Sequence, residues 1–233
     1  MEWNDSEMDH PEWPRDISSY DAKQEIARQM AARLRDNDVV GVGSGSTSLL
    51  ALRTLVDQAR VQGWTFRAIT TSLEMEIACA ELGVRTSSLL NERPNWSFDG
   101  ADEIDGDLNM IKGRGGAMLR EKLIIASSPE RYILVDASKQ VEKLGLKFPI
   151  PLELVPESLQ LVQAQLSERF DVHHAELRMA VGKDGPVITE NRNVILDVKF
   201  ADVTPELDTR LNSVPGIVGT GLFVGFHPTV ISA

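Results

Sequence analysis

The side chains best suited to chemistry lie in four short segments, the first of which is acidic. Asp99 and Asp102 belong to the run Ser97-Phe98-Asp99-Gly100-Ala101-Asp102-Glu103, directly after a stretch that reads as a strand. Carboxylates at a strand end can act as acids, bases or metal ligands, and close charges push their pKa values apart, which suits acid and base roles. The spacing of a calcium-binding loop is absent here. Because an isolated acidic run is as often an exposed loop, this segment alone leaves both interpretations open.

The segment from Ile111 to Lys122 combines a lysine, a glycine run and a glutamate. Lys112 precedes the run Gly113-Arg114-Gly115-Gly116, and Glu121 falls just over one turn inside the helix that follows. A lysine and exposed backbone N–H groups can hold developing negative charge, and a partly buried glutamate can act as a base. On its own, Glu121 between two basic neighbours reads more readily as helix surface.

The third segment is rich in glycine and hydroxyl groups, and the fourth ends in a lysine. Gly41-Val42-Gly43-Ser44-Gly45-Ser46-Thr47 lies between a predicted strand and a predicted helix, where successive N–H groups bind anions. It is not a dinucleotide fingerprint, because the third glycine would fall on Ser46, and no Gly-Lys-Ser/Thr of a P-loop follows. Lys139 ends Val135-Asp136-Ala137-Ser138-Lys139, where it either pairs with a phosphate or is an ordinary solvated lysine.

The elements that must position these segments alternate between strand and helix. Helical spacing of apolar residues predicts helices, and short apolar runs predict strands between them. Such alternation is typical of a parallel sheet covered on both faces, whose ligands bind beyond the carboxyl ends of the strands. The predicted strands are residues 39–42, 66–70, 96–99 and 132–136, and the predicted helices are residues 20–35, 46–58, 73–82 and 117–126.

The pattern changes near Phe148-Pro149-Ile150-Pro151, which we interpret as a stiff crossover into a second unit. A helix over 158–170, a strand over 175–180, a turn between strands over 187–198 and a helix over 205–211 predict a small α+β unit of the split βαβ kind. The apolar stretch Ile217–Val224 is expected to return to the first sheet. The predicted fold is therefore α/β, with a Rossmann-like, mostly parallel sheet and a smaller, ferredoxin-like α+β domain.

This pattern divides the chain into three parts. Residues 1–19 read as an irregular extension, residues 20–148 and 215–233 as the main domain, and residues 149–214 as the small domain.

Composition narrows the classes of partner. The net charge of −11 argues against a nucleic-acid surface, and no apolar run approaches the length of a membrane span, about 18 residues. A single cysteine, Cys79, excludes an intramolecular disulfide, and the acidic, polar N-terminus does not resemble a secretory signal. We therefore expect a cytoplasmic protein that binds neither nucleic acid nor membrane.

Taken in order, the segments resemble the A-type ribose-5-phosphate isomerases from about Ala22 to Phe223. The matching stretches are GVGSGSTS, FDGADEIDGDLNMIKGRGGAMLREKLI, VDASKQVEKLG with FPIPLEL, ENRNVILDV, and VPGIVGTGLF. Each motif is modest alone, whereas the ordered set is highly specific. The resemblance implies an isomerase that interconverts ribose 5-phosphate and ribulose 5-phosphate through an enediolate, without a metal or organic cofactor, as a dimer or tetramer.

The resemblance also implies a role for each candidate residue. Glu121 is similar to the family's catalytic base, Lys112 to the lysine that stabilises the charged intermediate, and Asp99 and Asp102 to the acidic pair that contacts the sugar hydroxyls. The remaining candidates are expected to bind the substrate, with the two lysines close to its phosphate: Ser44, Gly45, Ser46, Thr47, Gly100, Ala101, Gly113, Arg114, Gly115, Lys139 and Lys23.

Three alternatives remain beside this interpretation. A sugar-phosphate sensor without catalytic activity would share the fold, but it normally follows a basic helix-turn-helix segment, which the acidic N-terminus does not resemble. An isomerase of another pentose phosphate would differ only in the shape of its pocket. A nucleotide-dependent oxidoreductase fails on the glycine spacing and on Thr70-Thr71, where an acidic residue would end the second strand.

Overall fold

The computed structural model describes residues 20–232 of the chain. The extension expected over residues 1–19 lies outside the described residues, so that expectation stays untested. Within the described range, no helix is both long and apolar enough to cross a membrane.

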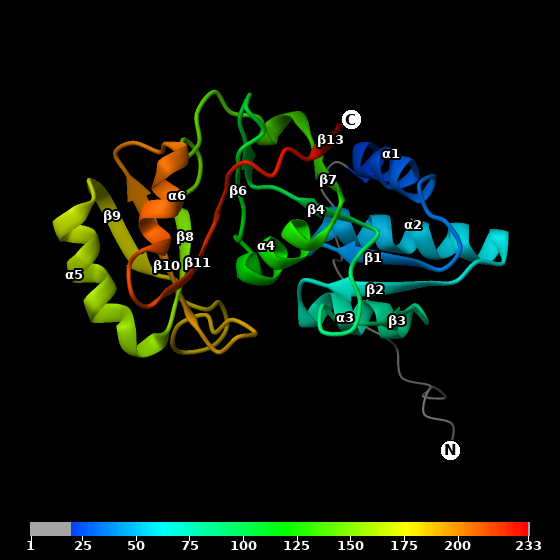
Figure 1. The fold of residues 1–233 in the computed structure, drawn as a ribbon, viewed down its shortest axis with the longest axis horizontal. Coiled ribbons are helices and arrows are strands. Elements are labelled where there is room, and N and C mark those ends of the chain that lie inside the picture. Colours follow the sequence, from blue (N-terminus) through cyan, green and yellow to red (C-terminus); the bar gives the residue numbers. More distant parts are fainter. Residues whose placement is uncertain (1–19, 233) are drawn as a thin grey trace, which may run out of the picture.

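The larger part of the protein is built on a six-stranded parallel sheet in the order β13-β7-β4-β1-β2-β3 (Figure 1). The four predicted strands form its centre, and two strands that the sequence did not predict, β3 and β13, form its edges. Their bounds are β1 (Asp38–Val42), β2 (Phe66–Thr70), β3 (Arg85–Thr86), β4 (Trp96–Gly100), β7 (Glu130–Val135) and β13 (Thr229–Ser232).

Alternating side chains of these strands pack on two different faces. Val40 and Val42 join the main apolar cluster with α1, α2 and α3, while Val39 of the same strand packs with Ile124 of α4 on the other face. This period of two places helices on both sides of the sheet, as predicted. The helices are α1 (Tyr20–Ala31), α2 (Ser46–Gln62), α3 (Leu73–Glu81) and α4 (Met118–Ser127).

The smaller part is an antiparallel sheet with two helices, and it confirms the predicted ferredoxin-like class. Its strand order is β11-β8-β10-β9, so β10 lies between the two strands joined by α5. That arrangement is a split βαβ unit. Its elements are β8 (Ile150–Leu154), α5 (Leu159–Arg169), β9 (Val172–Leu177), β10 (Val194–Phe200), α6 (Pro205–Asn212) and β11 (Ile217–Thr220).

The expectation of a crossover at Phe148–Pro151 is wrong in part, because Ile150 begins strand β8. Pro151 is tolerated there for a geometric reason. The carbonyl of Pro151 accepts from the N–H of Gly221, so the backbone nitrogen of Pro151, which carries no hydrogen, faces the same side. It lies beyond Leu152, which is the residue at the N-terminal end of the pairing between β8 and β11. A proline at that point removes no hydrogen bond from the ladder.

The expectation that Ile217–Val224 returns to the first sheet is also wrong. Strand β11 belongs to the small sheet, and β12 (Leu222–Phe223) pairs with β6 (Met110–Ile111), which in turn pairs with β5 (Glu103–Ile104). Only β13 returns, parallel to β7. The chain turns at Gly221, where a Cβ atom would lie 2.4 Å from the carbonyl oxygen of Lys112. The residues before this turn, in β11, belong to the small sheet, and those after it, in β12, pair with β6.

Candidate active site

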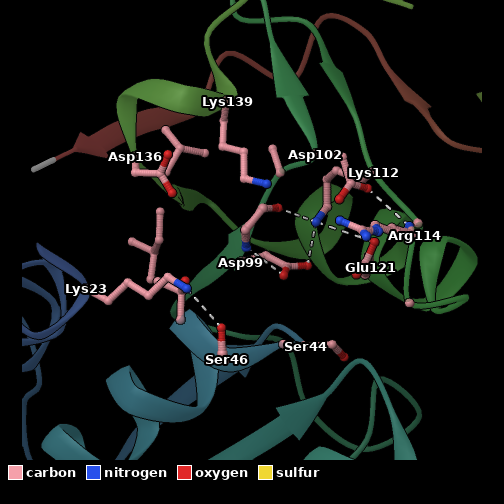
Figure 2. A pocket seen from close by; sticks show the side chains of 18 of the residues that line it. Lys23, Ser44, Ser46, Asp99, Asp102, Lys112, Arg114, Glu121, Asp136 and Lys139 are labelled. Atoms are coloured by element: carbon pink, nitrogen blue, oxygen red, sulfur yellow. Dashed lines mark hydrogen bonds and ion pairs between the residues drawn. The ribbon is translucent and has the colours of Figure 1, made fainter. Parts of the chain in front are cut away.

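A cavity of about 390 Å³ opens where strands β1, β4 and β7 end, and all the predicted catalytic and substrate-binding residues line it (Figure 2). The carboxyl ends of parallel strands meet at one edge of a sheet, which is why segments far apart in sequence converge here. The predicted residues lining the cavity are Lys23, Ser44, Gly45, Ser46, Thr47, Asp99, Gly100, Ala101, Asp102, Lys112, Gly113, Arg114, Gly115, Glu121 and Lys139.

Lys112 is the centre of a buried charge cluster at one end of this cavity. Its Nζ lies 3.0 Å from Oδ2 of Asp99 and 3.4 Å from Oε2 of Glu121, and it also donates to the carbonyl of Gly100. Burial alone would lower the pKa of Lys112, but the Asp99 and Glu121 carboxylates outweigh it, and the pKa rises above its usual value. Lys112 is therefore a permanent cation fixed between two acids.

The two carboxyls share that cation and hold their protons more tightly than free acids do. Burial raises the pKa of Asp99, although Lys112 and the N–H of Gly100 oppose the rise. Burial also raises the pKa of Glu121 to about 8, with a further contribution from the charge of Asp99, while Lys112 opposes the shift. A carboxyl with a pKa near neutrality can both accept and return a proton, as a base that shuttles protons must.

Asp99 owes its place to a glycine on the neighbouring strand end. A Cβ atom at Gly43 would lie 2.2 Å from Oδ1 of Asp99, so no larger residue fits there. That Oδ1 accepts from the N–H of Gly100 at 2.7 Å, and the backbone N–H of Ser44 also donates to the carboxylate. The carboxylate is thus fixed by backbone groups as well as by Lys112.

The glycine run after Lys112 folds into a tight turn over the cavity. Gly113 and Gly116 adopt positive φ angles of 101° and 90°, and the N–H of Gly116 donates to the carbonyl of Gly113 at 3.0 Å. The backbone N–H of Arg114 donates to Oδ2 of Asp102 at 3.1 Å. The Arg114 guanidinium lies 5.3 Å from the centre of the Phe148 ring. The loop therefore presents backbone N–H groups beside the charge cluster, and its one large side chain rests on an aromatic ring.

Two further lysines line the cavity, one from helix α1 and one from the turn after β7 (Figure 2). Lys23 donates to Oγ of Ser46 at 3.1 Å. Burial lowers the pKa of Lys23, Asp136 raises it, and Lys139 lowers it again. Together with the N-terminus of α2, where Ser46 lies, these cations make a site suited to a small anion.

One predicted donor is directed elsewhere. The hydroxyl of Ser44 lies 2.6 Å from Oγ1 of Thr71 and 2.8 Å from Oγ of Ser72, so it joins two strand ends. Ser44 therefore contributes its backbone to the cavity, whereas the hydroxyl of Ser46 contacts Lys23.

Sequence reasoning missed Asp136 and Ser138, which also line the cavity. The side chain of Asp136 accepts from the N–H of Ser138 at 2.8 Å. The pKa of Asp136 lies below its usual value, and the main cause is its hydrogen bonding with Ser138. Its position directly after β7 matches that of Asp99 at the end of β4, which was the available signal. Among the described residues, no three His, Cys, Asp or Glu side chains are grouped to hold a metal ion.

Comparisons with known proteins agree with this geometry. Residues 67–233 match the sequence model of the family described as ribose 5-phosphate isomerase A (phosphoriboisomerase A). The chain is 40% identical over 213 residues to ribose-5-phosphate isomerase A of a Synechococcus strain, and the alignment covers 90% of this chain and 91% of the relative. The same enzyme of Methanothermobacter thermautotrophicus is 37% identical over 212 residues, covering 90% and 92%.

Solved structures give the same result. The structure of ribose 5-phosphate isomerase A from Methanocaldococcus jannaschii aligns with a TM-score of 0.84 and 37% identity, over 88% of this chain and 92% of that one. A D-ribose-5-phosphate isomerase in complex with phospho-erythronic acid aligns with a TM-score of 0.85 and 34% identity, over 90% and 93%. The chain belongs to the ribose 5-phosphate isomerase A family.

Proposed function

We propose that this protein is an aldose-ketose isomerase that interconverts D-ribose 5-phosphate and D-ribulose 5-phosphate, a reaction of the non-oxidative pentose phosphate pathway. The observation that carries the proposal is Lys112 held between Asp99 and Glu121 in a cavity that Lys23 and Lys139 also line. The charge cluster suits enolisation and the two lysines suit a phosphate, in a cavity of about 390 Å³ that suits a small sugar phosphate.

Glu121 is assigned as the base. It removes the proton from C2 of the open-chain aldose and returns it to C1 of the enediolate. Its raised pKa, about 8, lets one carboxyl do both steps without a second base. The helix that carries it begins at Met118, so Glu121 sits in the first turn, facing the cavity beside the glycine loop.

Lys112 and the glycine loop are assigned to the oxygen that becomes negative. The ammonium is buried, with its side chain only 4% exposed, so its attraction for an oxyanion is weakly screened by water. The glycine loop supplies a further donor, the N–H of Gly115, because the N–H of Arg114 already donates to Asp102. Fixed donors of this kind stabilise the transition state because they need no reorganisation as charge develops.

Asp99 and Asp102 are assigned to the sugar hydroxyls and to ring opening. Asp99 has a raised pKa and can carry a proton to or from a substrate oxygen, whereas Asp102 is oriented by the N–H of Arg114. The strand-end residues Gly100 and Ala101 line the cavity between them.

The phosphate is assigned to Lys23, Lys139 and the α2 N-terminus from Gly45 to Thr47. A dianionic phosphate relieves the repulsion between the two lysines, which face each other closely enough for Lys139 to lower the pKa of Lys23. Helix N-termini bind phosphate through exposed N–H groups.

A direct assay tests the proposal. Purified protein is incubated with ribose 5-phosphate in D2O with EDTA, and the products are followed by NMR. Ribulose 5-phosphate carrying deuterium at C1 is the expected product, because a carboxyl base exchanges its proton with solvent between the two steps. Arabinose 5-phosphate, the C2 epimer, should give a lower kcat/KM. Binding without turnover would favour the sensor alternative, and activity lost in EDTA but restored by a divalent cation would contradict the metal-free scheme.

We also propose that the protein acts in the cytoplasm as a homodimer or homotetramer. The single cysteine and the family membership support the first part. Leu73 and Ile77 of α3 and Leu123 of α4 are about half exposed, and burial in an assembly would remove this apolar surface from water. Size-exclusion chromatography with light scattering tests the assembly, and a monomeric mass at micromolar concentration would contradict it.

A further inference from the structure

The glycine loop of the site is held from outside by a residue of the small antiparallel unit. Arg178 directly follows β9, and its Nη1 donates to the carbonyl of Gly113 at 2.8 Å and to the carbonyl of Arg114 at 2.9 Å. Both bonds cross from one sheet to the loop beside the other. No role for Arg178 follows from the sequence motifs, because it lies outside all of them.

The guanidinium that makes these bonds is itself rigidly placed. Its Nε lies 2.7 Å from Oδ2 of Asp197 and its Nη2 lies 2.5 Å from Oδ1, which is a bidentate pair. The two side chains are only 17% and 11% exposed. The backbone of Arg178 is also fixed, since its N–H donates to Ile195 and its carbonyl accepts from Val187. A planar guanidinium held at this many points has one orientation.

Holding a carbonyl also sets the direction of the N–H in the same peptide group. The peptide bond is planar and trans, so its N–H points opposite to its C=O. In the peptide between Gly113 and Arg114, the carbonyl faces Arg178 and the N–H donates to Oδ2 of Asp102 at 3.1 Å. In the next peptide the carbonyl of Arg114 faces Arg178, so the N–H of Gly115 points away from it.

The N–H of Gly115 is the one that can donate to a ligand. Gly115 lines the cavity, and within the described part of the chain its N–H has no protein acceptor. The first N–H already has a carboxylate partner, Asp102. The Gly115 N–H is therefore a donor that is fixed by the peptide plane and left available for a ligand oxygen.

We propose that Arg178 is a positioning residue for the isomerisation: through two carbonyl groups it aims the Gly115 N–H at the developing oxyanion and the Arg114 N–H at Asp102. This inference rests on the function proposed for the same site. It also gives the small unit a part in the reaction, since Arg178 and Asp197 both belong to that unit and neither lines the cavity.

A positioning role of this kind predicts a selective kinetic effect. The Gly115 donor is worth most when negative charge develops, so its misalignment raises the barrier more than it weakens substrate binding. Removing one oxyanion donor outright costs about 10²–10³ in kcat, so a donor that is misaligned should cost about ten- to hundredfold. KM should change less than about threefold, because the donor contributes little to binding of the uncharged ground-state oxygen.

The experiment measures kcat and KM for the wild type, Arg178→Ala and Arg178→Lys. Arg178→Ala should lose kcat with little change in KM, and added guanidinium ion at a concentration far below that of denaturation should restore part of it. Lysine cannot pair with Asp197 at two points and reach two carbonyls, so Arg178→Lys should be nearly as slow. Lys199→Ala, which removes an exposed cation of the same sheet, is the matched control and should keep the wild-type kcat.

A double variant separates positioning from folding. Arg178→Ala leaves the Asp197 carboxylate buried without its cation, which destabilises the unit. Arg178→Met combined with Asp197→Leu removes both charges and should recover thermal stability. If kcat remains low in the stable double variant, the proposal stands. If kcat recovers together with stability, or if Arg178→Ala keeps full kcat, the proposal is overturned.

A binding measurement keeps this test apart from the function proposed above. Calorimetry with 4-phospho-erythronate, whose carboxylate places negative oxygens near the loop, should show weaker binding to Arg178→Ala than to wild type, while inorganic phosphate should bind both equally. If the wild type fails to isomerise ribose 5-phosphate, the proposed function fails, and this difference in binding still reports on Arg178. Equal binding of 4-phospho-erythronate would contradict the positioning role.

Discussion

The Nζ atom of Lys112 lies 3.4 Å from Oε2 of Glu121, and that oxygen receives no well-formed hydrogen bond from the described residues. The contact is an ion pair that leaves a lone pair of the carboxylate available. Lys112 directly follows strand β6 and Glu121 lies in the first turn of α4, so the glycine loop that joins the two elements brings a carboxyl group and a cation to one point. Enolisation needs this pairing, because the carbon loses a proton while the neighbouring oxygen gains charge.

Replacing Lys112 with methionine tests how the buried acids depend on their cation. Removing one partner of a buried ion pair costs about 3–5 kcal/mol, because the remaining charges lose their compensation. Asp99 and Glu121 would respond by holding protons more tightly, so the loss in free energy of unfolding should be largest at alkaline pH and small near pH 4, where both acids are protonated. Denaturant titration of the variant at several pH values measures it.

The matched control for this change is Lys143→Met. Lys143 pairs with Asp202 at 2.5 Å, but both side chains are more than half exposed. Water screens an exposed ion pair, so the control should barely change the free energy of unfolding. A Lys112→Met variant no less stable than Lys143→Met at pH 8 would show that the buried cluster does not depend on the lysine.

The raised pKa of Glu121 predicts the pH dependence of the rate. The base acts in its ionised form, so kcat/KM should rise as pH increases through the pKa of the free enzyme, about 8, and level off above it. The charge of Asp102 is one cause of the raised pKa, so Asp102→Asn should move the midpoint of the rise to lower pH, whatever its effect on the rate itself.

The control for that shift is Asp107→Asn, an exposed carboxyl in the same acidic run. Its profile should coincide with that of the wild type. If kcat/KM were flat from pH 6 to pH 9, a group with a pKa near 8 would not be the base.

Lys139 is expected to act on binding rather than on chemistry. The lysine lines the cavity and lies 5.9 Å from the centre of the Phe148 ring. A hydrogen bond to a charged group contributes about 1.5–3 kcal/mol, so Lys139→Ala should raise KM about ten- to hundredfold while kcat changes little. Inhibition by inorganic phosphate should weaken in parallel. Lys183→Ala, at an exposed turn, is the control, and a kcat loss without a KM change in Lys139→Ala would contradict the assignment.

The elements that position the site were predictable where local pattern is strong. The strand Phe66–Thr70 has the bounds that its sequence predicts, and Asp99 and Lys139 were found because each lies at or shortly after the carboxyl end of a strand. Strands β5, β6 and β12 have two residues each, which is too short to show a period. Strand β8 was obscured by Pro149 just before it and by Pro151 within it, and only Pro151 lies at the end of the ladder with β11.

Long-range partners left no local trace in the sequence. Glu103 belongs to the acidic run, yet it is fully buried, and its carboxylate accepts from the backbone N–H groups of Gly145, Lys147 and Phe148 at 2.7 Å each. Arg178 reaches a loop that is distant in sequence. Such contacts depend on how the two sheets are placed, and no spacing along the chain encodes that placement.

The carboxyl of Glu121 can be removed without harm to the fold. Its pKa rises from 4.5 to about 8 on folding, so the ionised form opposes folding, and this cost grows as pH rises between those values. At pH 8, the free energy of unfolding of Glu121→Gln should therefore equal or exceed that of the wild type. Any loss of rate at that pH then reports on chemistry.

The most direct test of the account is the kcat of Glu121→Gln on ribose 5-phosphate at pH 8, measured beside the exposed control Glu76→Gln. A positioned general base contributes about 10²–10⁴ in rate, so the Glu121 variant should lose at least that factor while it still binds 4-phospho-erythronate, and the control should match the wild type. A Glu121→Gln enzyme that turns over ribose 5-phosphate at the wild-type rate would show that the proton is carried by another group.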